Sequence, residues 1–110
     1  MTAKMTYFQI VPDESNYHGT FTLPACTYAT VNAVTTGAAT ITVPTGAKFV
    51  NFSGSDNFYV NFTTTAVVPT TTVADGTTSI LNPGCRSVAG IATFSIIAPS
   101  SCIVTMEWYK

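Results

Sequence analysis

Apolar and polar residues alternate one by one in several short stretches of this chain, which is the pattern of β-strands that bury one face. The clearest example lies within residues 49–62, FVNFSGSDNFYVNF, where Phe58, Val60 and Phe62 occupy one face of the second half. Aromatic and β-branched residues fit the pleated surface of a strand. We therefore expect a strand here whose aromatic side packs into the protein interior.

The first half of the same stretch predicts a second strand. Val50 and Phe52 share a face, whereas the pattern leaves the direction of Phe49 open. Residues 54–56, Gly-Ser-Asp, separate the two halves and favour a tight turn. We therefore expect residues 49–62 to form a β-hairpin at the core of the domain.

Shorter stretches of the same kind occur on both sides of this hairpin and are separated by turn residues. The further strands expected are residues 6–11, 21–23, 27–34, 39–43, 88–98 and 102–109. No stretch shows the helical period of 3.6 residues. About seven to nine strands separated by turns predict an all-β fold, a single-domain β-sandwich over residues 1–110. A jelly-roll-like sandwich is the first expectation, and an immunoglobulin-like sandwich is the alternative.

The core is expected where large apolar side chains share strand faces. The predicted core residues are Val50, Phe52, Phe58, Val60, Phe62, Phe94 and Ile96. In residues 102–109 the alternation places Trp108 on the same face as Val104 and Met106. We expect Trp108 in the core, with an aromatic anchor at an interface as the alternative.

Residues 63–78 differ from the rest of the chain. They contain two threonine triplets, Pro69 and an Asp75-Gly76 turn signal. Proline is confined to the edges of sheets, so this segment predicts a long loop or an edge segment. Because a loop of this length has no obvious place in a compact sheet, we expect a partner to order it.

The chain is unusually poor in charge. It is 46% hydrophobic and only 8% charged, with a net charge of -1, against about 25% charged residues in ordinary domains. Four cationic residues form no basic patch, which disfavours nucleic-acid binding. No apolar run approaches the roughly 20 residues that span a membrane, and residues 1–11 lack the pattern of a signal peptide. We expect partners or copies of the chain to cover much of the surface, with a chance composition as the alternative.

Few residues offer catalytic chemistry. His18 is the single histidine and lies in a polar stretch with Asp13 and Glu14, so we expect it to be solvated. Zinc sites draw on several histidine and cysteine ligands, which this chain does not place together. The acids are scattered and define no carboxylate pair. We therefore predict no catalytic, cofactor-binding or metal-binding residues, and a protein that is not an enzyme.

The cysteines Cys26, Cys85 and Cys102 are odd in number and widely spaced. Such spacing is neither a disulfide framework nor a metal signature. We expect three unpaired thiols in a protein made in a reducing cytoplasm. Arg86 beside Cys85 predicts a lowered thiol pKa, but no general base accompanies this pair.

The second half of the chain resembles small proteins encoded beside the capsid genes of tailed bacteriophages. The resemblance rests on FYVNF at 58–62, AVVPTTTVADGTTSILNPG at 66–84, TFSIIAP at 93–99 and CIVTMEWYK at 102–110. Proteins of this kind are often capsid decoration proteins, also called cement or stapling proteins. The resemblance implies a jelly-roll or other β-sandwich fold and dimers or trimers that sit over capsomer junctions. It supplies no catalytic motif.

The leading hypothesis is therefore a structural virion protein that decorates a tailed-phage capsid and stabilises it by bridging capsomers. Its partners would be the major capsid protein and copies of itself, as a homotrimer or homodimer. It would be made in the host cytoplasm and reside on the capsid surface, without binding nucleic acid or membrane. The candidate contact segments are residues 63–78, which come first, and residues 13–19, 1–5 and 108–110.

The alternative hypothesis is a structural or carbohydrate-binding module of the tail or fibre. Aromatic side chains stack on sugar rings when they are exposed. The candidates for such stacking are Tyr7, Tyr17, Tyr28 and Trp108. Location on the virion distinguishes this alternative from decoration of the head.

Overall fold

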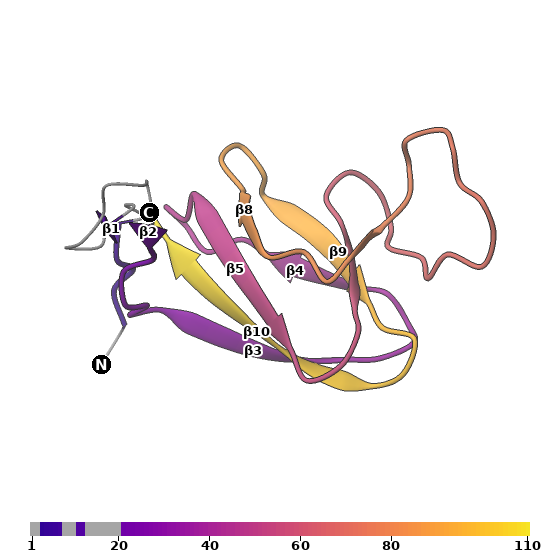
Figure 1. Cartoon of the computed structure of the whole chain (residues 1–110), viewed down its shortest axis with the longest axis horizontal. Helices are drawn as coiled ribbons and strands as arrows, with labels where there is room; N and C mark the ends of the chain where they lie inside the picture. Colours follow the sequence, from indigo (N-terminus) through magenta and orange to yellow (C-terminus); the bar gives the residue numbers. More distant parts are fainter. Residues whose placement is uncertain (1–2, 8–10, 13–20) are drawn as a thin grey trace.

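The computed structural model describes residues 3–7, 11–12 and 21–110. Two four-stranded sheets pack against each other (Figure 1), and the described residues contain no helix. The first sheet has the order β3 (Ala29–Val34), β10 (Cys102–Tyr109), β5 (Phe49–Gly54) and β8 (Cys85–Ser87). The second has the order β4 (Ala39–Thr42), β9 (Thr93–Ile97), β6 (Tyr59–Asn61) and β7 (Ile80–Leu81). The expected all-β sandwich is confirmed.

The strand order is that of a jelly roll. The neighbouring pairs β3–β10, β4–β9, β5–β8 and β6–β7 join the first strand of the sandwich to its last, the second to the second-last, and so on inward. All of these pairs are antiparallel. A long antiparallel ribbon that is rolled up gives this arrangement, with eight strands in two sheets. The jelly-roll expectation is therefore confirmed over the immunoglobulin-like alternative.

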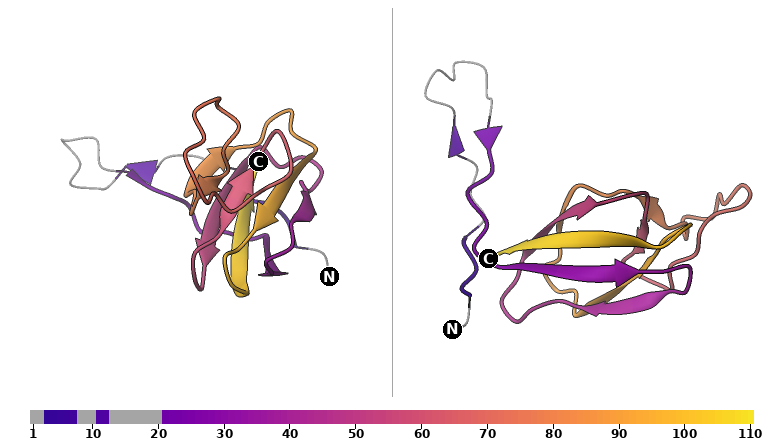
Figure 2. Two further views of the ribbon diagram at one scale, coloured as in Figure 1. Left: turned by 90° about the vertical axis from the view of Figure 1, so that its right-hand side faces the viewer. Right: turned by 90° about the horizontal axis from the view of Figure 1, so that it is seen from below.

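A separate two-stranded sheet precedes the sandwich. It pairs β1 (Val11–Pro12) with β2 (Phe21–Thr22) and stands away from the two larger sheets (Figure 2). The prediction of a continuous strand at residues 6–11 was wrong for the described residues, because Thr6 makes only an isolated parallel bridge with Tyr109. Residues 8–10 lie outside the described part. The expected loop at residues 13–19, with His18, lies outside it as well.

The predicted hairpin at residues 49–62 is not present. Its two strands lie in different sheets: β5 pairs with β10 and β8, whereas β6 pairs with β9 and β7. Period-2 alternation reports that one face of a strand is buried, but not which strand lies beside it. The chain instead crosses between the sheets after Gly54. A Cβ atom at Gly54 would lie 2.6 Å from Cδ1 of Phe58, so only glycine fits this crossing.

The predicted core is largely confirmed. Val50, Phe52, Phe58, Val60, Phe94 and Ile96 are all buried. Phe62 is only partly buried and packs against the core from its border. Phe49, whose direction was left open, is half-buried.

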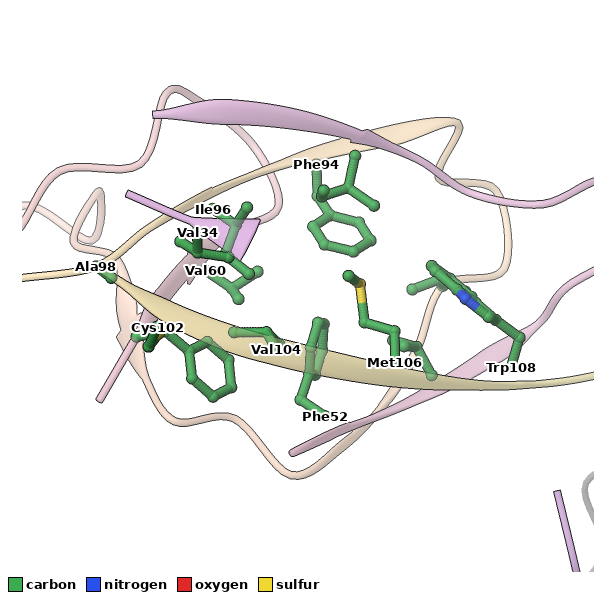
Figure 3. Packing of buried hydrophobic residues seen from close by; sticks show 14 of the residues in the cluster. Val34, Phe52, Val60, Phe94, Ile96, Ala98, Cys102, Val104, Met106 and Trp108 are labelled. Carbon is green, nitrogen blue, oxygen red and sulfur yellow. The ribbon is translucent and has the colours of Figure 1, made fainter. Parts of the chain in front are cut away.

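Aromatic rings form the centre of this core (Figure 3). The ring of Phe94 lies 5.6 Å from that of Phe52 and 6.2 Å from that of Trp108, measured between centroids. Trp108 is 1% exposed, which confirms its place in the core. Its indole Nε1 donates a hydrogen bond to Oγ1 of Thr30 at 2.9 Å. The one polar atom of the indole is thereby satisfied inside the sandwich.

The strand expected at residues 88–98 is shorter than predicted. β9 covers Thr93–Ile97, and the chain turns at Gly90, whose φ of 79° favours glycine. Val88 is buried although it lies outside any strand. Ala92, which the alternation of a strand over residues 88–98 would place on the face of Phe94, is exposed. Within the described residues, no helix offers the length and apolar character that crossing a membrane requires.

Candidate functional site

Residues 63–78 form a loop between β6 and β7, and we call them the threonine loop. The loop projects from the end of the sandwich that is remote from the C-terminus (Figures 1 and 2). It contains no strand, as the sequence predicted.

Asn61 fastens both ends of the threonine loop. Its side chain is only 5% exposed. Oδ1 accepts hydrogen bonds from the backbone N–H groups of Thr63 at 3.0 Å and Thr64 at 2.9 Å. Nδ2 donates to the carbonyl oxygen of Thr77 at 3.0 Å and lies 3.4 Å from Oγ of Ser79. One buried amide therefore joins the segment that enters the loop to the segment that leaves it.

Two serine hydroxyls bind backbone N–H groups near the base of the loop. Oγ of Ser79 accepts a hydrogen bond from the N–H of Val67 at 3.0 Å, and Oγ of Ser95 accepts one from the N–H of Ala66 at 2.8 Å. Ala66 is consequently buried, with 1% of its surface exposed. These bonds hold the base of the loop without a partner, and for the rest of the loop the expectation that a partner orders it stays a prediction.

The outer part of the loop has its own anchor at Asp75. The carboxylate Oδ1 accepts hydrogen bonds from Thr77, from the hydroxyl at 2.6 Å and from the backbone N–H at 3.1 Å. These bonds hold the pKa of Asp75 below its ordinary value of 3.8, with the hydroxyl as the largest cause. Asp75 is also the one charged residue between Asn61 and Cys85. The loop surface is therefore almost neutral.

Exposed apolar side chains concentrate on the loop and on the short strand that follows it. Within the described residues, Val67 is 61% exposed and Val73 is 41% exposed. Ile80 and Leu81 of β7 are 40% and 48% exposed. These residues make up half of the large hydrophobic side chains found exposed in the described part of the chain. Such clustering marks interaction sites more often than single exposed residues do.

Two open hollows flank Thr63–Thr65. One, of about 450 Å³, lies inside the loop against Val67 and Val73. The other, of about 490 Å³, lies over the outer face of the second sheet against Thr40 and Ser95. Neither hollow is lined by an ionisable side chain. The two hollows therefore offer methyl and hydroxyl groups for contact.

The other candidate groups do not gather at this surface. Among the residues that the structure describes, no group of three or more His, Cys, Asp or Glu side chains is placed to hold a metal ion. Cys26, Cys85 and Cys102 are free thiols, as expected. The lowered pKa predicted for Cys85 was wrong: burial is the largest effect and raises its pKa, against the weaker opposing effect of Arg86.

The aromatic candidates are less accessible than the sequence indicated. Trp108 and Tyr109 are each 1% exposed, which removes both as contact groups and removes Trp108 as a platform for a sugar. Tyr28 is half-buried, and Tyr17 lies outside the described residues. Tyr7 is 68% exposed, and the ammonium group of Lys110 lies 5.6 Å from the centroid of its ring.

Comparisons of this chain with protein-family models, with curated proteins and with solved structures found no match. The candidate surface therefore rests on the geometry of the chain itself. Asn61 is the residue in it that sequence reasoning missed, because alternation grouped it with the outward-facing residues of its strand. The sequence did contain a local signal. Threonines follow Asn61 two and three residues later, and an asparagine side chain can accept hydrogen bonds from backbone N–H groups at those positions.

Proposed function

We propose that this protein is a structural virion protein that decorates the outer surface of a tailed-phage capsid and stabilises it by bridging capsomers. Its partners are the major capsid protein and copies of itself, as a homodimer or homotrimer, and it has no enzymatic activity. It is made in the host cytoplasm and binds neither nucleic acid nor membrane. The observation that carries this proposal is the threonine loop, a nearly neutral projection with a fixed base and exposed apolar side chains.

The order of the loop favours its use as a contact surface. Immobilising a flexible segment on binding costs free energy, and a segment that is already fixed avoids most of that cost. The bonds from Asn61, Ser79 and Ser95 fix the base of the loop before any partner arrives. The loop therefore presents Val67 in one defined position.

A capsid supplies many equivalent junctions, which suits a contact of modest strength. Linking several weak contacts raises the overall affinity through effective concentration, without new chemistry at each contact. A bridging protein adds buried apolar area at every junction it covers. The low charge of the loop fits contacts that depend on burial, which salt screens little.

The test is binding to capsids of the parent phage assembled without this protein. Sedimentation of mixtures measures how many copies bind, at low and at high salt. We expect binding that changes by less than about twofold with salt. Val67→Lys should lower the affinity by about tenfold or more, because docking would bury an unpaired charge. Ile103→Lys is the control, since Ile103 is 47% exposed on the first sheet, whereas the threonine loop joins two strands of the second sheet.

Three results would contradict the proposal. The first is no binding at either salt concentration. The second is density for this protein only on the tail in a reconstruction of the intact particle, which would favour the tail or fibre alternative. The third is an equal effect of the Val67 and Ile103 substitutions, which would remove the loop as the contact surface.

A further inference from the structure

The sandwich has four edge strands, and β3 is the longest of them. β7 has two residues and is closely followed by Pro83, while β8 has three residues and carries Arg86. Short length, charge and nearby proline are the features that protect sheet edges from pairing with other chains. β3 has six residues, ATVNAV, with neither charge nor proline. Its edge therefore lacks these protections.

The backbone of β3 has one side free within the described part of the chain. β10 is its single partner strand there. The N–H of Trp108 donates to the carbonyl oxygen of Tyr28 at 3.0 Å, so Tyr28 faces β10. In an antiparallel ladder alternate residues direct both backbone groups to the same side. Ala29, Val31 and Ala33 consequently direct their N–H and C=O groups to the free edge.

We propose that β3 pairs antiparallel with β3 of a second copy of this chain, about a two-fold axis centred on Val31. This register places Val31 opposite Val31 of the second copy, and Ala29 opposite its Ala33. All three residues that face the free edge then find partners, with up to about six backbone hydrogen bonds. Val31 is 62% exposed on the outer face, and the pairing brings the two valine side chains together.

The charge distribution favours a second copy as the occupant of this edge. Residues 19–47, which include both β3 and β4, contain no Asp, Glu, Lys, Arg or His. A two-fold interface places the same surface of both copies together, so a charge near the axis would meet its like. The β3 strand carries no charged residue. β4 is the edge strand of the second sheet on the same side of the sandwich (Figure 2), and the same rotation brings the two β4 strands to the junction.

This inference rests on the self-association included in the proposed function and does not depend on the capsid. β7, which follows the threonine loop, and β3 lie at opposite edges of the sandwich. A dimer joined through β3 therefore leaves both threonine loops free. The two surfaces can be tested with a matched pair of valines, because Val31 and Val67 are 62% and 61% exposed.

Sedimentation equilibrium of the purified protein, without capsids, tests the pairing. We expect a monomer–dimer equilibrium whose dissociation constant rises by about tenfold or more in Val31→Lys, because like charges then lie directly opposite. Val67→Lys should leave this constant within about twofold of the wild-type value. Circular dichroism verifies that both variants remain folded. A monomer at all concentrations, a trimer, or equal effects of the two substitutions would overturn the proposal.

Hydrogen exchange gives a second measurement that needs no substitution. The amide of Val31 faces the proposed junction, whereas the amide of Thr30 faces β10. Exchange at Val31 should be slow in concentrated protein and faster on dilution, and exchange at Thr30 should stay the same. Exchange at Val31 that is independent of concentration would exclude the β3 junction. Capsid binding plays no part in either measurement, so failure here is distinct from failure of decoration.

Discussion

The side-chain amide of Asn61 donates a hydrogen bond to the carbonyl oxygen of Thr77, 16 residues further along the chain, at 3.0 Å. On its other side the same side chain accepts from Thr63 and Thr64. The threonine loop is therefore closed at its neck by one residue. Asn61 is therefore the residue whose side chain joins the two ends of the loop.

Removing this clamp should destabilise the protein and loosen the loop. Asn61→Ala removes three part-buried hydrogen bonds to the backbone, and we expect a loss of about 2–3 kcal/mol in a urea melt. The amide of Val67 should then exchange faster. Asn57→Ala is the control: Asn57 is exposed and its loss should cost less than about 1 kcal/mol. Equal losses in the two variants would contradict the clamp.

Phe94→Ala should remove the centre of the aromatic cluster. Phe94 is 3% exposed, so truncation leaves a cavity and should cost about 3–5 kcal/mol in unfolding free energy. Phe62→Ala, at the border of the core, should cost clearly less. A chemical melt that gave under about 1 kcal/mol for Phe94→Ala would show that the sheets pack differently.

Gly54→Ala should be destabilising for a steric reason. The added Cβ would meet Cδ1 of Phe58 at 2.6 Å and the backbone oxygen of Asp56 at 2.7 Å. The backbone contact cannot move away as a flexible side chain would, and we expect a loss of about 1–3 kcal/mol. Gly37→Ala meets its nearest atom at 3.8 Å and should be nearly neutral. A melting temperature unchanged in Gly54→Ala would refute the tight crossing.

The pH dependence of the loop should follow Asp75. Its pKa in the folded state is lowered, so its contribution to stability is present above the ordinary pKa of 3.8 and is lost as the pH falls through the folded value. Thr77→Val removes the hydroxyl group that is the largest cause of the lowered pKa of Asp75. We expect the pKa of Asp75 to rise toward 3.8 in an NMR titration, whereas Thr77→Ser should keep it low. No difference between these variants would argue against the hydrogen bond.

Sequence reasoning predicted burial correctly where the alternation within a single strand determines it. In β10 the alternation predicted Val104, Met106 and Trp108 on the buried face, and all three are buried. The loop at residues 63–78 was predictable too, because Pro69 and Asp75-Gly76 oppose a regular strand.

Sequence reasoning failed for strand pairing, which depends on residues far apart in the chain. Residues 49–62 have the alternation of a hairpin, yet β5 and β6 pair with residues that lie 20 or more positions away in the chain. Period-2 alternation carries no information on that choice. Likewise, nothing in the strand pattern distinguishes Asn61, which is buried by its bonds to the loop, from an outward-facing asparagine.

The position of β10 in the first sheet has a consequence for how the protein is made. β10 lies between β3 and β5, and β9 likewise lies between β4 and β6. Both central strands are the last of the ten to leave the ribosome, and the strands on either side have no direct contact in the ladder without them. Neither sheet can close during the earlier part of synthesis, so folding must wait for late, non-local pairings, which are slow. The nascent chain therefore exposes its uncharged β3 segment until β10 has been made, and unpaired strands of this kind are prone to aggregation.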